Sequence, residues 1–275
     1  MVALRSAMKS IFGGWLVTDS NNNLGLIIFV FFVYYAVCNA LWLRRANSEN
    51  PLPKLRRITG LDAIDEAIGR ATEMGRPVVY NVGTNAFTAA TFASLATVSY
   101  VAQRAAHYDT RLIVLMGYPA VLPVAEQTVR QAYLEAGKPD AYRGDDVRFL
   151  TNDQFGYASG SVGVVVREKA AAHIMFGYFA AESLILAEAG FEAGAIQIAA
   201  TTNSVQTPFF VASCDYTMLG EEIYVASAYL SKNRVRIATL IAQDMGKVFL
   251  VVLLIAGVIL TTFGSTAMQD LMTLY

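Results

Sequence analysis

The chain has 275 residues, of which 55% are hydrophobic, and its mean hydropathy is +0.42. A soluble globular domain is about 45–50% apolar, so the excess indicates segments that face lipid. The formal net charge of −1 gives a nucleic-acid partner no electrostatic support, and we predict none. Two isolated cysteines, Cys38 and Cys214, give no disulfide framework and fit a reducing compartment.

Residues 1–23 are predicted to lie outside the cytoplasm. Their apolar residues recur at helical spacing up to Gly13-Gly14, and Trp15 suits the headgroup level, so a short interfacial helix is one interpretation. A partly ordered tail is the other. The apolar run that follows is too long for the core of a secretory signal, so we expect an uncleaved anchor.

An unbroken apolar run from Leu24 to Leu43 is the first predicted transmembrane helix. Its 20 residues match the roughly 20 that cross a bilayer core. Asn39 is its one amide, and we expect that side chain to meet a partner helix or the interface rather than lipid. Arg44 and Arg45 flank the run and open a basic linker, residues 44–57, in which prolines favour extended chain.

A second apolar run, Val248 to Phe263, predicts the return span. It is slightly short, so the span is expected to begin before Lys247, within one continuous helix over residues 234–263 that is followed by a tail at 264–275. The run is apolar on every face, which disfavours the alternative of a core helix in a soluble domain.

Basic residues gather on the sides of both runs that face the middle of the chain. By the positive-inside rule, the central region is cytoplasmic and both termini lie outside a prokaryotic cell membrane. These flanking residues are Arg44, Arg45, Lys54, Arg56, Arg57, Lys232, Arg234, Arg236 and Lys247.

The central region, residues 58–233, alternates helical patterns with short apolar runs, which predicts an α/β domain with a doubly wound, mostly parallel sheet. The expected strands are Pro77–Gly83, Arg111–Tyr118, Val147–Thr151, His173–Tyr178, Ala195–Ala200 and Phe209–Ser213. The expected helices are Asp62–Met74, a helix capped by Thr84 and running to Tyr108, Val124–Ala136, Tyr157–Arg167, Ala181–Ala189 and Glu221–Leu230.

Three strings resemble those of an uncharacterised prokaryotic membrane-protein family with a domain of unknown function between membrane helices. The resemblance implies a recurring membrane-anchored α/β module, and it supplies no activity, cofactor or catalytic residue. The strings are PLPKLRRITGLDAIDEAIGRATEMGRPV (Pro51–Val78), AGAIQIAATTNSVQTPFFVASCDYTMLGEE (Ala193–Glu222) and AYLSKN (Ala228–Asn233).

Motifs for catalysis or cofactor binding are scarce in the sequence. His107 and His173 have no Cys or carboxylate at ligand spacing, so we predict no metal, and no nucleotide-binding loop occurs. The glycine-rich segment Gly156–Gly163, with Gly160 and Ser161, is expected to follow a strand and open a helix, where amides bind anions; close helix packing is the alternative. Cys214 reads as a buried, inert thiol. We predict no cofactor and no catalytic residue.

A polar set is expected beyond the carboxyl ends of the strands, where open parallel sheets bind ligands. Glu182, Asp215 and Asp153 are its acid–base candidates, and helix caps with solvated acids are the alternative interpretation. The candidate ligand-binding residues are Thr84, Asn85, Asn152, Gly160, Ser161, Glu182, Thr201, Thr202, Asn203 and Asp215, with Tyr118 and Ser204 beside them.

Two functions remain open from the sequence. The first is a membrane-anchored, homo-oligomeric scaffold, whose partners are the bilayer, further copies of the chain and other membrane proteins. The second is a small-molecule sensor or enzyme that uses the crevice at the strand ends. A transporter is a weaker third, because two helices are too few to form a pore within one subunit.

Overall fold

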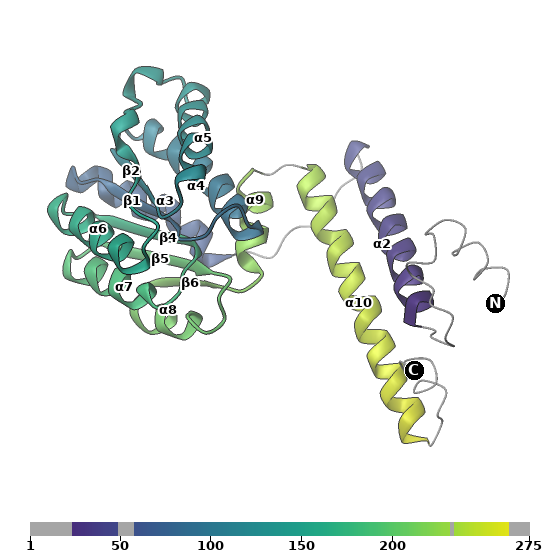
Figure 1. Cartoon of the computed structure of the whole chain (residues 1–275). Helices are drawn as coiled ribbons and strands as arrows, with labels where there is room; N and C mark the ends of the chain where they lie inside the picture. The colour runs from purple at the N-terminus through teal and green to yellow at the C-terminus, as the bar shows by residue number, and fades with distance from the viewer. Residues whose placement is uncertain (1–23, 49–57, 232–233, 264–275) are drawn as a thin grey trace. The chain divides into compact units, whose positions relative to one another are not determined.

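The computed structural model describes residues 24–48, 58–231 and 234–263, and the chain divides into two units (Figure 1). One unit consists of residues 1–54 and 233–275, and the other of residues 55–232. The predicted segments 1–23 and 264–275, and most of the 44–57 linker, lie outside the described residues.

Two long helices, α2 (Leu24–Asn47) and α10 (Arg234–Thr262), pack side by side in the first unit (Figure 1). Both are long and apolar enough to cross a membrane, and only 6% and 11% of their most apolar windows are buried. They are therefore not core helices. The predicted continuous helix over residues 234–263 is confirmed, whereas α2 continues through Arg44 and Arg45, which were expected to begin the linker.

Small residues on α10 form its contact with α2. Ala238 and Ala242 are fully buried, and Gly246 lies against the ring of Tyr35, where a Cβ would come within 3.4 Å of Cδ2. Because these three residues are four apart, they share one face of the helix and let the two backbones approach closely.

Aromatic rings and an arginine join the same two helices. The Phe249 ring lies 5.9 Å from Phe31 and 4.9 Å from Tyr34, centroid to centroid. Arg234 donates through Nε to the carbonyl of Ala46 (3.0 Å) and through Nη2 to that of Ser48 (2.7 Å), so it satisfies carbonyls at the end of α2.

The Asn39 side chain does not reach α10 through its amide nitrogen. Nδ2 donates instead to the Tyr35 carbonyl of its own helix, at 3.0 Å. The preceding turn thus offers this nitrogen an acceptor, and the expectation that the amide group meets a partner helix or the interface stays a prediction.

The second unit contains a six-stranded, all-parallel sheet in the order β3-β2-β1-β4-β5-β6. Side chains of the central strands are buried on both faces, as expected for parallel strands covered by helices. The strands are β1 (Val78–Gly83), β2 (Leu112–Met116), β3 (Val147–Phe149), β4 (Ala172–Tyr178), β5 (Ile196–Thr201) and β6 (Tyr216–Leu219).

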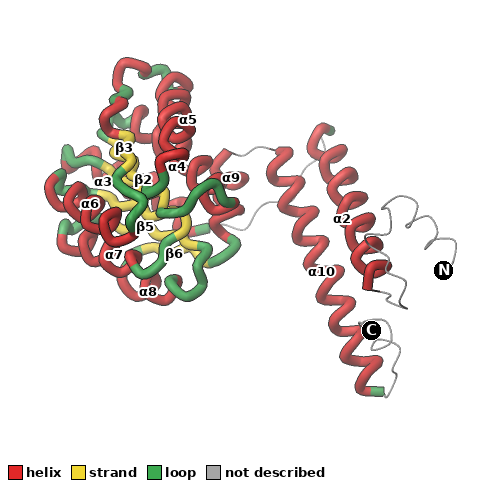
Figure 2. The backbone as a smooth tube through the Cα atoms, viewed as in Figure 1, coloured by secondary structure: helices red, strands yellow, loops and turns green. Residues whose placement is uncertain are grey.

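Helices cover both faces of this sheet (Figure 2). One layer contains α3 (Thr59–Met74), α4 (Ala89–His107), α5 (Leu122–Glu135) and α9 (Glu222–Ser231). The other contains α6 (Gln154–Arg167), α7 (Glu182–Glu192) and α8 (Thr207–Ser213). Strand side chains alternate between the layers, so Tyr80 packs with the first and Val79 with the second.

Two predicted elements are wrong. Phe209–Ser213 belongs to helix α8, which begins at Thr207-Pro208, and the sixth strand is β6. Proline suits the first turn of a helix, and Phe210 is buried against Phe179 at 5.7 Å. Helix α4 starts at Ala89, where Thr88 forms a capping box, and not directly after Thr84, where the cap was expected.

Candidate functional site

The strand order reverses between β1 and β4, and the chain is tightly packed where these two strands end. Gly83 has φ +100°, and a Cβ there would lie 2.5 Å from the carbonyl oxygen of Tyr178. Thr84 donates its amide to that same carbonyl at 3.3 Å. Ligands of open parallel sheets bind beyond this edge, so the residues around Thr84 form the first candidate site.

Glu182 lies at this edge with its side chain fully buried. Its Oε1 accepts from Thr84 Oγ1 at 3.2 Å, and its Oε2 accepts from Gln154 Nε2 at 2.6 Å. It is also the first residue of α7, where the helix dipole favours a negative charge. The carboxylate therefore ties the end of β1 to the starts of α6 and α7, and both of its oxygens are already engaged.

A buried polar network lies on the α6 side of the two central strands. Asn81 of β1 accepts at Oδ1 from Tyr157 Oη (2.8 Å) and Ser161 Oγ (3.0 Å), both on α6. Its Nδ2 lies 2.7 Å from Nε2 of His173 on β4. All four side chains are fully buried, and burial raises the pKa of Tyr157.

His173 is neutral and its tautomer follows from Asn81. Because Asn81 Oδ1 accepts two hydroxyl donors, Nδ2 is the donor to His173 Nε2, and the ring proton is on Nδ1. That Nδ1 and Gln197 Oε1 are the two buried side-chain polar atoms without a hydrogen-bond partner among the described residues. Both lie against Gly190 of α7. Burial lowers the pKa of His173 to about 4. The neighbouring Gln197 side chain raises this pKa, but by less than burial lowers it.

Several predicted site residues serve local structure at the carboxyl edge. Asp153 caps α6 by accepting from the Gly156 amide at 2.6 Å, and Asn203 donates through Nδ2 to the Phe179 carbonyl at 3.0 Å. Thr201 accepts at Oγ1 from the Asn203 amide at 3.2 Å. Asn152 is exposed, while Asn85 and Thr202 are half-buried in the adjoining loops.

Gly160 and Ser161 lie in the middle of α6, because the helix already begins at Gln154. Their amides are beyond the first turn, so they are bonded within the helix and are not free for an anion. A Cβ at Gly160 would lie 3.2 Å from Leu150, and Ser161 belongs to the buried network. The prediction of helix-opening amides at these two residues is wrong, and close packing is their observed role.

Asp215 lies at the opposite, amino edge of the sheet, because it precedes β6 instead of following a strand. Its Oδ2 accepts from the backbone amide of Gln197, near the start of β5, at 2.8 Å. The structure therefore separates Asp215 from Glu182. Burial raises the pKa of the neighbouring Cys214 thiol to about 12, which fits an inert cysteine.

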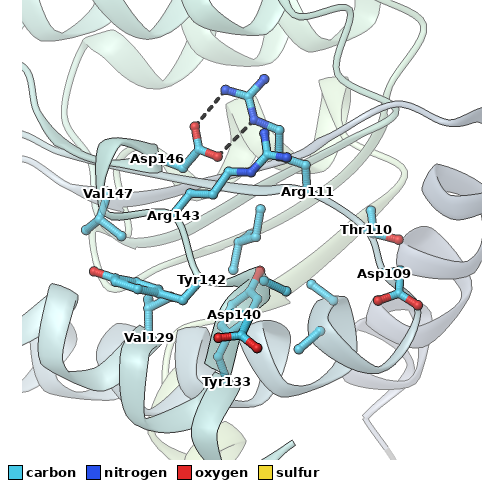
Figure 3. Close-up of a pocket in the computed structure, with 14 residues that line it drawn as sticks. Asp109, Thr110, Arg111, Val129, Tyr133, Asp140, Tyr142, Arg143, Asp146 and Val147 are labelled. Carbon is cyan, nitrogen blue, oxygen red and sulfur yellow. Dashed lines mark hydrogen bonds and ion pairs between the residues drawn. The ribbon is translucent and has the colours of Figure 1, made fainter. Parts of the chain in front are cut away.

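A cavity of about 170 Å³ opens at the amino edge, between the end of α4, α5 and the segment that leads into β3 (Figure 3). Its polar lining consists of Asp109, Thr110, Arg111, Tyr133, Asp140, Tyr142, Arg143 and Asp146. Tyr133 and Tyr142 stack edge to face at 6.0 Å, and burial raises the pKa of Tyr133 to about 12. The predicted site did not include this cavity.

Arg111 forms one wall of the cavity. It is bidentate to Asp146, with Nη2–Oδ1 at 2.6 Å and Nε–Oδ2 at 2.8 Å, and its Nη1 reaches Glu168 Oε2 at 2.8 Å. These bonds raise the pKa of Arg111. The Arg143 side chain extends toward Arg111, and it has no ion pair within the described part of the chain (Figure 3). Arg143 is therefore the cation that this cavity offers to a ligand.

Among residues 24–48, 58–231 and 234–263, no group of three or more His, Cys, Asp or Glu side chains is placed to hold a metal ion.

The comparison with protein families identifies one match. A model described as a domain of unknown function, DUF6754, matches residues 17–272. The chain belongs to this family. The predicted membership of an uncharacterised family is thereby confirmed, and the DUF6754 match covers both long helices as well as the α/β domain. No curated protein and no solved structure matches the chain.

Proposed function

We propose that this DUF6754 protein is a two-pass protein of a prokaryotic cell membrane. In this proposal it displays a doubly wound α/β module in the cytoplasm and acts as a homo-oligomeric structural unit. The observation that carries the proposal is the pair formed by α2 and α10, which is apolar, exposed to its surroundings and closely packed on itself. In water such a surface would be costly, whereas lipid accommodates it.

The basic residues support the cytoplasmic side for the α/β module. Arg44 and Arg45 lie in the last turn of α2, and Arg234 begins α10, so positive charge collects where the pair leads into the module. The strand order β3-β2-β1-β4-β5-β6, with one helical layer on each face, supports the doubly wound topology.

Exposed apolar side chains on the α7–α8 side of the domain support assembly. They are Leu184, Ile185, Val205, Phe209 and Val211. Apolar side chains left exposed on one side of a domain can be covered by a second copy, and membrane tethering raises the effective concentration of copies.

Reporter fusions test the topology. A reporter that is active only outside the cytoplasm is fused after Ser48 in one series and after Phe263 in another. We expect activity after Phe263 and none after Ser48. Activity after Ser48 would refute the proposed orientation. Light scattering of the purified protein in mild detergent tests assembly, and a monodisperse monomer contradicts the homo-oligomeric role.

Small-molecule binding is a second candidate function, and the amino-edge cavity supports it better than the carboxyl edge does. Glu182 has both oxygens engaged, whereas Arg143, which has no ion pair among the described residues, lines a cavity that also contains two tyrosines, Asp109 and Asp140. A ligand with a carboxylate or phosphate group fits that chemistry. Inorganic phosphate is therefore the probe: it should raise the melting temperature of the wild type and have less effect on Arg143→Gln. An equal effect on both proteins rejects the site.

A further inference from the structure

The contacts between α2 and α10 fix which residues lie at the same depth. Tyr34 stacks on Phe249 at 4.9 Å and its hydroxyl lies 3.4 Å from the carbonyl of Met245, while Arg234 reaches Ser48 at the other end of the pair. The helices are therefore antiparallel. Residues 245–249 of α10 lie beside the middle of the apolar run Leu24–Leu43.

This register carries two charged side chains of α10 into the depth range of that run, and one of them is Lys247, which was expected from the sequence to flank the membrane. Asp244 and Lys247 form an i,i+3 pair at 3.4 Å, beside the Tyr34 level. Leu24–Leu43 has the length of a bilayer core, so its middle lies about 15 Å from either surface. A bilayer shifted to cover Val248–Phe263 would instead leave the apolar residues Tyr34–Leu43 outside it.

The charged pair lies on the side of α10 that faces away from α2. Asp244 is two residues from both Ala242 and Gly246, which contact α2, so at about 100° per residue it projects from the opposite side. The Asp244 and Lys247 side chains are 67% and 44% exposed. Charged groups at such a depth face protein or water rather than lipid.

We propose that this face of α10, defined by Asp244 and Lys247, is the contact with α10 of a second copy of the chain inside the membrane. The inference rests on the proposed membrane function. Copies in one membrane have the same orientation, so a two-fold axis along the membrane normal brings their α10 helices together in parallel. Asp244 of each copy then pairs with Lys247 of the other, because a two-residue motif with one charge of each sign is complementary to itself under this rotation.

Charge reversal in the full-length protein tests the contact. Asp244→Lys leaves two positive charges on the face, and Lys247→Asp leaves two negative charges. We expect each variant alone to lose self-association at least tenfold, measured by single-molecule photobleaching in liposomes. Co-expression of the two variants should restore complexes, and these should contain one copy of each. An ion pair within one copy cannot produce this complementation.

Controls separate this contact from folding and from membrane insertion. Glu73→Lys reverses an exposed charge on α3, in the helical layer that does not include the α7–α8 side, and should assemble as the wild type does. Single variants that assemble as well as the wild type, or a mixture that fails to associate although each variant resists trypsin normally, overturn the α10 contact. A wild-type protein that alkaline carbonate removes from membranes instead overturns the proposed anchoring itself.

Discussion

His173 shows how one buried side chain makes stability depend on pH. The ring is neutral, bonded to Asn81 and fully buried, and its pKa is about 4, compared with about 6.5 in an unfolded chain. Between these values the unfolded state binds more protons than the folded state, so stability falls as pH falls from 6.5 toward 4.

We expect the domain to lose up to about 3 kcal/mol from this group alone over that pH range. Thermal unfolding of the wild type and of His173→Gln, measured at pH 7 and at pH 4.5, checks the prediction. The variant is less stable at pH 7 but should show a smaller loss on acidification. Equal losses in both proteins would show that His173 does not titrate as its burial predicts.

Gly190 illustrates a requirement for a small residue without any unusual backbone angle. A Cβ at this position would lie 2.8 Å from His173 Nδ1 and closer still to Gln197 Oε1. We therefore expect Gly190→Ala to destabilise the domain by about 1–3 kcal/mol through overpacking. Chemical denaturation measures this change in the free energy of unfolding.

Gly69→Ala is the matched control for that variant. Gly69 also lies within a helix, but nothing would touch its Cβ within 4 Å. Alanine there should stabilise α3 by about 0.5–1 kcal/mol. If both substitutions have the same sign, the crowding at Gly190 does not determine its effect.

At the scale of elements, the start of α6 depends on one cap. Asp153 accepts from the Gly156 amide at 2.6 Å, and the same helix brings Tyr157 and Ser161 to Asn81. Asp153→Ala should cost about 1 kcal/mol, whereas Asp153→Asn should cost little, since asparagine caps as well. Thermal unfolding compares them, and an equal loss in both variants contradicts the capping role.

Element prediction from sequence succeeded where one pattern has one meaning. The apolar runs at residues 112–116 and 172–178 are flanked by helical periodicity, and both are buried parallel strands. The prediction of a strand at Phe209–Ser213 failed because a short apolar run fits a buried strand and a short helix equally well. Pro208 was the local signal for the helix. The spacing of Ala238, Ala242 and Gly246 likewise indicated a helix contact that sequence reasoning missed.

At the scale of the whole molecule, the sites depend on contacts that local pattern does not contain. Asn81 meets His173 across 92 residues, and Glu182 meets Thr84 across 98. Glu182 was predicted at the correct edge because it follows a strand, whereas Asp215 was misplaced together with the strand assigned before it. The wall of the amino-edge cavity forms where Arg111 contacts Asp146 and Glu168, and no sequence motif predicts these contacts.

The general organisation, by contrast, follows from composition. Two long apolar runs separated by an alternating α/β pattern predict two exposed helices that flank one domain in the sequence, and the structure contains both helices and the domain. Long uninterrupted apolar stretches are recognised without tertiary information. The division of the chain into two long helices and one domain is therefore the part most easily predicted from the sequence.

The pairing of α2 with α10 also has a consequence in time. Roughly 185 residues separate Ser48 from Arg234, and a ribosome adding about 5–20 residues per second needs about 10–40 s to synthesise them. Throughout that interval the nascent α2 has no Phe249 to stack on and no Arg234 to donate hydrogen bonds to the carbonyls at its C-terminal end. Its own composition must therefore keep it in place until α10 has been synthesised, so the contact between the two helices forms only after the chain of the α/β domain has been made.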